Sequence, residues 1–437
     1  MTPEKTTSWA EERSQMRAAA TNVILHLHPT RVPAAALRFT YTWGLGGMSA
    51  TLAVLLVLTG VLLQFRYDAT IEGAYTSILL LESQVKFGSL IRSIHHWSAN
   101  LLVVTVFLHL LRVFLTGGFK RDRATNWLIG LGLLIVVLAF NFTGYLLPWD
   151  QLAYWAATVS TSLIDYIPVV GTAVSNFILG GTEIGQNTLR NFYALHVAVL
   201  PVILAAALTY HFWRIRRDGG ISQPENVRQG GLRLTTIPHL VRRETAVGAT
   251  LIAAVLIWSM FIPAPLAELA NPALSPNPAK AAWYFLGLQE LLLHMQPLAA
   301  MSLTGIVLAG LLLLPRWDRQ DSDIGVYFRS RRGRTAALIG AILGLQIVPV
   351  LVIVDELWLD WTVLFPTLPA FVANGLLPLA LTLLGLAAIY AGLRWLLRTN
   401  HSEAFVGLFS FIMASLVMLT VIGVYFRGEN MVLLWPW

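Results

Sequence analysis

Two pairs of histidines stand in two strongly apolar segments of the sequence. His95 and His109 are fourteen residues apart, and His196 and His211 are fifteen apart. At about 1.5 Å of rise per residue, each spacing separates the two rings by roughly 21 Å, on broadly one face of a helix. Two such helices side by side would make two bis-imidazole sites near opposite membrane faces. This ligation suits the iron of two non-covalent b-type haems.

His96 is the weaker ligand, because thirteen residues from His109 it would point some 140° away. An alternative without haem stays open, in which the four histidines are hydrogen-bonded residues inside membrane helices. Ionisable groups in a bilayer are costly and usually functional, and two pairs at near-equal spacing favour ligands.

The composition is that of a polytopic membrane protein. The chain is 56% hydrophobic and 12% charged, with a mean hydropathy of +0.66. It has no cysteine, which excludes disulfides, iron–sulfur ligation and thioether-linked haem within this chain. The net charge of +7 lies in loops between apolar spans, where orientation in the membrane explains it better than nucleic-acid binding.

Nine apolar segments predict an all-α membrane protein with about nine spans. We expect a four-helix haem-binding bundle followed by further transmembrane helices. The predicted spans are 44–64, 92–116, 127–147, 191–213, 246–263, 299–315, 336–354, 370–397 and 403–426.

Arginine and lysine alternate sharply between the loops. They follow the second, fourth, sixth and eighth spans, whereas 151–189 and 355–393 contain none. Basic loops stay on the cytoplasmic side, so the N-terminus is predicted to be cytoplasmic. The first twenty residues are polar and charged, which does not resemble a cleavable signal peptide. This orientation pairs the histidines as His95 with His196 on the outer side and His109 with His211 on the inner side.

Glycines repeat the histidine spacing in the two spans that carry no ligand. Gly46 and Gly60 are fourteen apart in the first span, and so are Gly130 and Gly144 in the third. Small residues there would let a porphyrin approach the backbone. Close helix packing is the alternative explanation.

Two arginines lie three residues from the histidines of the second span, a spacing that places side chains next to each other on a helix. Arg92 precedes His95 by three residues, and Arg112 follows His109 by three. Each could pair with a haem propionate or, alternatively, anchor the helix at the interface. Pro201 interrupts the fourth span between its histidines and is expected to bend it.

The outer loops could hold an apolar ring ligand. Residues 144–151 end the third span, and 151–190 read as short amphipathic pieces in the interface. The loop 264–298 is rich in proline and then contains Trp283-Tyr284-Phe285 and Glu290. Interfacial aromatics are usually anchors, but a cleft lined by them binds apolar rings.

These residues resemble cytochrome b of the quinol-oxidising cytochrome bc complexes. The resemblance is strong over about 35–222, and the fifteen-residue histidine spacing is similar to the chloroplast and cyanobacterial branch. The segments that carry it are 92–99, 109–120, 144–151, 192–196 and 211–212.

The resemblance implies a mechanism and partners. Quinol would be oxidised at the outer side, with one electron leaving to a separate Rieske-type iron–sulfur subunit and then to a c-type cytochrome or similar acceptor. The other electron would cross two b haems to an inner quinone site, coupled to proton translocation, in a homodimeric complex. The residues implied for the outer site are Gly144, Tyr145, Pro148, Trp149, Trp283 and Tyr284.

The chain departs from the family in two places. Ala281 and Ala282 stand where the family has the proline and glutamate of Pro-Glu-Trp-Tyr, and that glutamate is thought to take a proton from the quinol. Glu290, about two helical turns on, is the best substitute. Gly44 occupies the position at which chloroplast-type relatives attach an extra haem through cysteine, so no covalent haem is expected.

Chloroplast-type relatives divide this protein into two chains, so one continuous chain suggests a fused form in a bacterial inner (cytoplasmic) membrane. Two other functions stay open: a dihaem anchor of another quinone-linked oxidoreductase, and a haem-free proton-linked transporter. The predicted division is 1–43 as a cytoplasmic segment, 44–222 as the dihaem domain, 223–245 as a cytoplasmic linker, 246–355 as a C-terminal domain with the outer loop, and 356–437 as additional helices.

Overall fold

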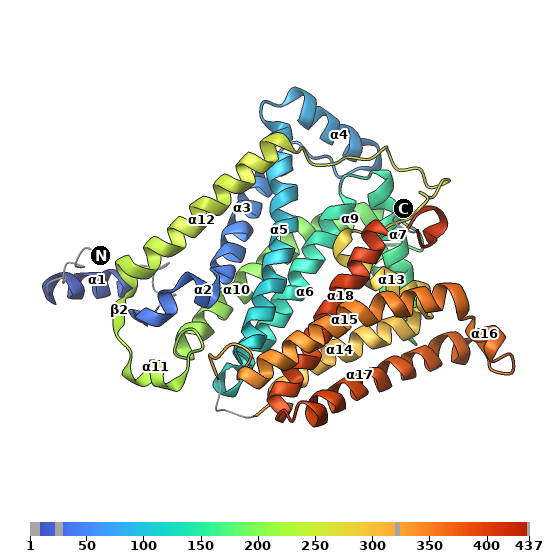
Figure 1. The fold of residues 1–437 in the computed structure, drawn as a ribbon. Helices are drawn as coiled ribbons and strands as arrows, with labels where there is room; N and C mark the ends of the chain where they lie inside the picture. The colour runs from blue at the N-terminus through green and yellow to red at the C-terminus, as the bar shows by residue number, and fades with distance from the viewer. Residues whose placement is uncertain (1–8, 22–28, 320–323, 435–437) are drawn as a thin grey trace.

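The computed structural model describes residues 9–21, 29–319 and 324–434, and most of these are helical (Figure 1). Parts of the predicted cytoplasmic segment 1–43 lie outside the described residues. A short antiparallel ribbon pairs β1 (Arg31–Pro33) with β2 (Arg233–Thr235). The ribbon joins the N-terminal segment to the linker between the fourth and fifth spans.

The prediction of nine spans is confirmed over the described residues, where nine helices are long and apolar enough to cross a membrane. The all-α polytopic fold is therefore as expected. The spans are α3 (Leu45–Gln64), α5 (Gly88–Leu115), α6 (Ala124–Leu146), α9 (Gln186–Ala194) continuing into α10 (Leu200–Arg217), α12 (Thr236–Phe261), α14 (Pro297–Trp317), α15 (Arg331–Trp358), α17 (Leu377–Leu396) and α18 (His401–Tyr425).

Shorter helices precede the first span or lie between spans. The amphipathic pieces expected within 151–190 include α7 and α8, whereas α4 was not foreseen. These helices are α1 (Trp9–Thr21), α2 (Phe39–Thr42), α4 (Ile71–Gln84), α7 (Gln151–Ile164), α8 (Gly171–Leu179), α11 (Glu225–Gly230), α13 (Leu286–His294) and α16 (Trp361–Leu364).

The fourth span contains a π turn, Leu195–Val199, which carries His196. Pro201 has no N–H, so the α-helical hydrogen bond expected at that position cannot form. The residue before it donates its N–H five positions back instead. A π turn holds more residues than an α turn. The wider interval between His196 and His211 therefore has a local cause.

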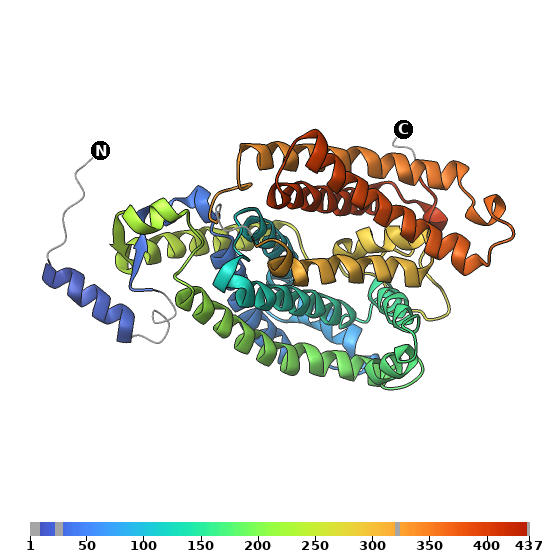
Figure 2. The same ribbon diagram turned by 90° about the horizontal axis from the view of Figure 1, so that it is seen from below.

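The first half of the chain forms a bundle of α3, α5, α6 and α10, in which α3 packs on α5 and α10 packs on α6 (Figure 1). The fifth span, α12, lies against α3 and α5. The spans α15, α17 and α18 form a layer at one side of this bundle, with α14 next to α6 (Figure 2).

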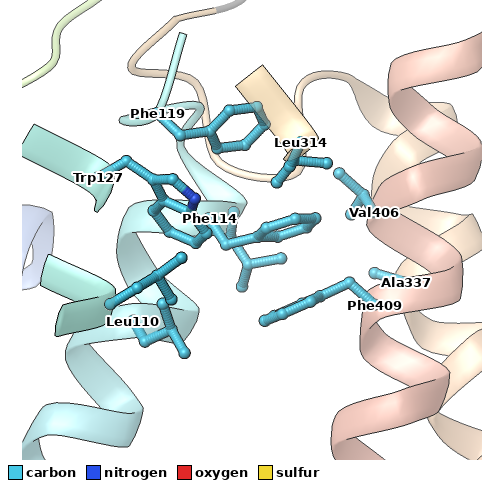
Figure 3. Close-up of a cluster of buried hydrophobic side chains, with 10 residues drawn as sticks. Leu110, Phe114, Phe119, Trp127, Leu314, Ala337, Val406 and Phe409 are labelled. Atoms are coloured by element: carbon cyan, nitrogen blue, oxygen red, sulfur yellow. The ribbon is translucent and has the colours of Figure 1, made fainter. Parts of the chain in front are cut away.

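Aromatic stacking joins the two halves of the chain. Phe114 of α5 lies on the ring of Phe409 of α18, with centroids 3.8 Å apart and planes 16° from parallel. Phe119 and Trp127 extend the same cluster, and Leu314 of α14 completes it (Figure 3). Buried aromatic pairs contribute beyond the area that they bury, so this cluster is a main contact between the halves.

Helices α15 and α18 approach each other through glycines. A Cβ on Gly340 would lie 2.1 Å from the carbonyl oxygen of Gly407, and one on Gly344 would lie 2.6 Å from that of Phe411. Small residues at such contacts bring helix backbones together in membranes, where dispersion and packing drive association.

Replacing Gly340 with alanine should therefore destabilise the protein by about 1–3 kcal/mol, the usual cost of overpacking. The matched control is Gly385→Ala in α17, where a Cβ meets open space. Its alanine should be neutral or stabilising by up to about 1 kcal/mol. Thermal unfolding of both purified variants would check this, and equal midpoints would contradict the close packing of α15 on α18.

Candidate functional site

The four candidate histidines meet in two pairs inside the first bundle. Helix α5 carries His95 and His109, and the fourth span carries His196 and His211. The ring centroids of His95 and His196 are 6.3 Å apart, and those of His109 and His211 are 6.5 Å apart. The structure thus brings together the same partners that the sequence paired, at opposite ends of the bundle. We name the end with His95 and His196 the outer end, after the orientation that the basic loops predict.

These separations fit a metal ion between the rings. Two imidazole nitrogens at about 2 Å from one metal ion would hold their ring centres about 6 Å apart. Haem iron accepts two axial imidazoles while the porphyrin supplies its other four ligands. The donor set and the spacing of each pair therefore fit a b-type haem.

Each of the four glycines predicted at the haems lies against a histidine ring. A Cβ on Gly144 would lie 2.6 Å from Cε1 of His196, which leaves no room for a side chain. The other pairs, with the corresponding distances, are Gly46 with His109 (3.3 Å), Gly60 with His95 (3.2 Å) and Gly130 with His211 (3.6 Å).

Two threonines that the sequence analysis missed orient the outer rings. Thr59 Oγ1 lies 2.9 Å from Nδ1 of His95, and Thr143 Oγ1 lies 3.0 Å from Nδ1 of His196. Both hydroxyls donate to carbonyls of their own helices, so their oxygens accept from Nδ1–H. The Nε2 lone pair is then free to bind a metal. In the sequence, each of these threonines directly precedes a predicted haem-contact glycine, as Thr59-Gly60 and Thr143-Gly144, and this repeat could have indicated their role.

His96 lies outside both ring pairs. Its ring meets the edge of Trp97, with centroids 4.9 Å apart. Its carbonyl accepts a hydrogen bond from Asn100 Nδ2 at 2.9 Å.

The two arginines expected at haem propionates have protein partners. Arg92 pairs with Glu82 of α4 and donates to the carbonyls of Ala264 and Pro265. Arg112 donates to the carbonyl of Tyr41 at 3.3 Å, and its guanidinium lies over the aromatic ring of Tyr41. Arg92 therefore ties α4 and the loop after α12 to the outer end of α5.

An apolar pocket of about 260 Å³ opens near the outer end of α6. Of its polar lining residues, Gln289 donates to the carbonyl of Ala279 and accepts from the N–H of Ala281, and Lys280 donates to the carbonyl of Val424. The rest of the lining is mostly apolar. The lining residues are Phe142, Leu152, Trp155, Ala156, Val159, Ser160, Leu163, Ile164, Pro276, Ala279, Lys280, Ala281, Phe285, Leu288, Gln289, Leu292 and Met301.

Asp150 builds the outer end of this region. Its carboxylate accepts from the N–H of Ala153, which caps α7, and from the N–H of Ala267 in the loop after α12. The backbone of Gln151 also bonds the carbonyl of Glu268. Segment 144–151 and the loop after α12 are thus held together.

The aromatic residues expected around the outer ligand lie near this pocket but do not line it. Trp149 is buried against Phe192, and Trp283 donates its indole N–H to Asn100. Burial first, and then the neighbouring Tyr145, raise the pKa of Tyr284 well above its usual range. Tyr284 is therefore protonated at neutral pH and can donate a hydrogen bond. The lining instead uses Phe142, Phe285 and the aromatic and aliphatic face of α7.

Glu290 does not point into the pocket, contrary to the expectation from the sequence. It is 1% exposed, and its carboxylate accepts from Nε of Arg427 at 3.0 and 3.1 Å and lies 3.3 Å from Nε2 of His294. Burial acts to raise the pKa of Glu290, but hydrogen bonds from His294 and Arg427 outweigh it, so the pKa is lowered. The residue that was expected to replace the family's glutamate is an ionised partner of Arg427.

Comparison with known proteins identifies the family of this arrangement. The model of the cytochrome b/b6/petB family matches residues 32–219. Cytochrome b6 of Synechococcus elongatus is 41% identical over 220 residues, which are 50% of this chain and 99% of that protein. Cytochrome b6 of Tupiella akineta is 42% identical over 216 residues, or 49% of this chain and 97% of that protein. The chain belongs to the cytochrome b/b6 family.

A chain of a hyperthermophilic respiratory Complex III has the same fold, with a TM-score of 0.66 at 22% identity. The likeness covers 95% of this chain and 98% of that one, so it includes the C-terminal spans. Membership of a cytochrome b family implies that this membrane protein binds b-type haem and takes part in electron transport.

Gly144 gives a direct test of the ring contacts. Gly144→Ala should displace the ring of His196 and lower the ratio of haem to protein, by up to about half if two haems are bound. Gly132→Ala in the same helix is the matched control, because a Cβ there meets open space. Pyridine haemochrome assays would measure both, and an unchanged haem content in Gly144→Ala would contradict the contact.

Proposed function

We propose that this chain is the dihaem cytochrome b of a bacterial quinol-oxidising cytochrome bc complex. The observation that supports this most is the pair of facing histidine rings near each end of one helical bundle. An apolar pocket beside the outer pair fits an apolar ring substrate.

His95 with His196 would hold the outer haem, and His109 with His211 the inner one. Haem supplies a carrier of single electrons when it is bound. The chain's own residues orient the ligand nitrogens through Thr59 and Thr143 and surround the sites with apolar helices that exclude water. Gly44 leaves no cysteine for a covalent haem, so the two haems proposed here are non-covalent.

Quinol would bind in the outer pocket between α6, α7 and α13. The aromatic and aliphatic lining would hold the ring and tail of a quinol. Tyr284, with Tyr145 beside it, lies next to the lining residue Phe285, and its protonated phenol would donate a hydrogen bond to a quinol that reaches beyond the lining. Gly144, Pro148, Trp149 and Trp283 would shape the approach from the neighbouring segments.

The electron that leaves the pocket outwards needs a partner subunit. The chain has no cysteine, so an iron–sulfur acceptor of the Rieske type must lie on another chain, followed by a c-type cytochrome or similar acceptor. The second electron would cross the membrane to a quinone on the inner side, within a homodimeric complex. This division would couple quinol oxidation to proton translocation.

The ligand assignment predicts two separate haem sites. His109→Ala should remove the inner haem and leave most of the outer one, which would lower the haem content by about half. His96→Ala is the matched control and should retain both haems, since its ring lies outside the pairs. Reduced-minus-oxidised spectra of the purified variants would check both, and loss of haem from His96→Ala would assign the ligands differently.

The proposed orientation places the N-terminus in the cytoplasm of a bacterium. Because the chain has no cysteine, single cysteines report their side of the membrane. Asn226→Cys should be protected from a membrane-impermeant maleimide in intact cells, and Thr182→Cys should be labelled, if the positive-inside rule holds here. The reverse labelling pattern would exchange the outer and inner haem sites.

A further inference from the structure

One face of α13 forms a wall of the outer pocket. The opposite face of α13 is held by Arg427, which follows α18. Leu288 and Leu292 line the pocket. Glu290 lies two residues from each, about 200° around the helix, and points away from the pocket. The carboxylate of Glu290 instead meets the guanidinium of Arg427, which follows α18.

Arg427 is the centre of a buried ion cluster. It is 3% exposed, and all three of its guanidinium nitrogens are used. Nε and Nη2 donate to Glu290, and Nη1 donates to Glu356 at 2.9 Å and to the carbonyl of Met431 at 2.8 Å. A bidentate arginine–carboxylate pair fixes orientation as well as distance. The last span is therefore locked to α13 and, through Glu356, to α15.

Two further tethers join the same segments. Lys280 of the pocket lining donates through Nζ to the carbonyl of Val424 at the end of α18, at 2.9 Å. Asn277 donates through Nδ2 to Oδ1 of Asn430 at 3.0 Å. The loop and helix that form this wall are thus held at three points by α18 and the residues after it.

Helix α13 packs closely on α18 through two glycines. A Cβ on Gly287 would lie 2.9 Å from Oγ1 of Thr420 and 3.1 Å from the carbonyl oxygen of Leu416. A Cβ on Gly423 would lie 3.1 Å from Cβ of Leu286. Because close-packed interiors transmit displacement, a shift at Arg427 would move the pocket wall.

We propose that Arg427 is a positioning residue for the outer quinol pocket: through Glu290 it fixes α13, so the last span forms part of the substrate site. This inference rests on the proposed quinol oxidation. It gives Glu290 a positioning role in place of the proton-accepting role expected from the sequence.

His294 gives the cluster a dependence on pH. It lies between Asp355 of α15, at 2.6 Å from Nδ1, and Glu290, and Arg427 also faces it. Burial acts to lower the pKa of His294, but hydrogen bonds to Asp355 and Glu290 raise it to about 9. The imidazolium and its bonds are therefore present at neutral pH and are lost as the pH rises through about 9.

The test uses the purified complex with its co-purifying subunits and a short-chain quinol. Arg427→Met should raise the KM for quinol about tenfold or more while both haems are retained, because small displacements of a binding wall are costly. Arg427→Lys should restore part of the loss. Arg398→Met is the matched control, since that exposed arginine lies at the other end of α18. It should leave the KM unchanged.

The pH profile separates positioning from mere stability. In the unsubstituted complex the KM should rise as the pH passes about 9, and His294→Gln should abolish that rise. If Arg427→Met does not assemble, Asn277→Ala still tests the wall, because it removes a tether outside the ion cluster and should raise the KM by a few-fold.

Several outcomes would overturn the proposal. It fails if an assembled Arg427→Met complex has the unsubstituted KM. Where Arg427→Met does not assemble, it fails if Asn277→Ala has the unsubstituted KM and lowers only the thermal midpoint. Failure of the proposed function is seen separately, as an unsubstituted complex that contains haem but does not oxidise quinol.

Discussion

The contact between imidazole rings and glycine backbones is the constraint on which the bundle depends. Two rings with a space for metal between them occupy the interior at each end, and the helices opposite must present no side chain there. A Cβ on Gly144 would lie only 2.6 Å from the ring of His196. The π turn at Leu195–Val199 accommodates Pro201 beside this contact, so that His196 meets both Gly144 and His95.

The C-terminal half depends on a different kind of contact. The hydrophobic effect contributes little to helix association inside a membrane. Close packing of helix backbones stabilises the association instead. Glycines bring α15 onto α18, and α18 onto α13, while Phe114 and Phe409 stack between the halves. The two cytochrome b6 sequences match about half of this chain, but the fold shared with the Complex III chain extends through 95% of it. The last spans are therefore part of the fold that the two chains share.

Polar contacts at the His95–His196 end of the bundle assemble the pocket from distant segments. Asp150 bonds the N–H of Ala267, Arg92 bonds the carbonyls of Ala264 and Pro265, and Arg427 bonds Glu290. Asp150, Arg92 and Arg427 are buried, and each is hydrogen-bonded, as a low-dielectric environment requires. These contacts hold loops that would otherwise be free to move. A pocket with apolar walls can persist between them.

The sequence by itself determined the spans, the histidine pairs and the matching glycine register, because hydropathy and helical spacing are properties of single segments. It also contained the Thr-Gly repeat, whose meaning appeared only when Thr59 and Thr143 were found on Nδ1 of the outer histidines. Tertiary structure alone decided that Glu290 faces Arg427, 137 residues away, and that Arg92 meets Glu82. Which way a helix is rotated depends on all its neighbours, and spacing within one helix does not encode them.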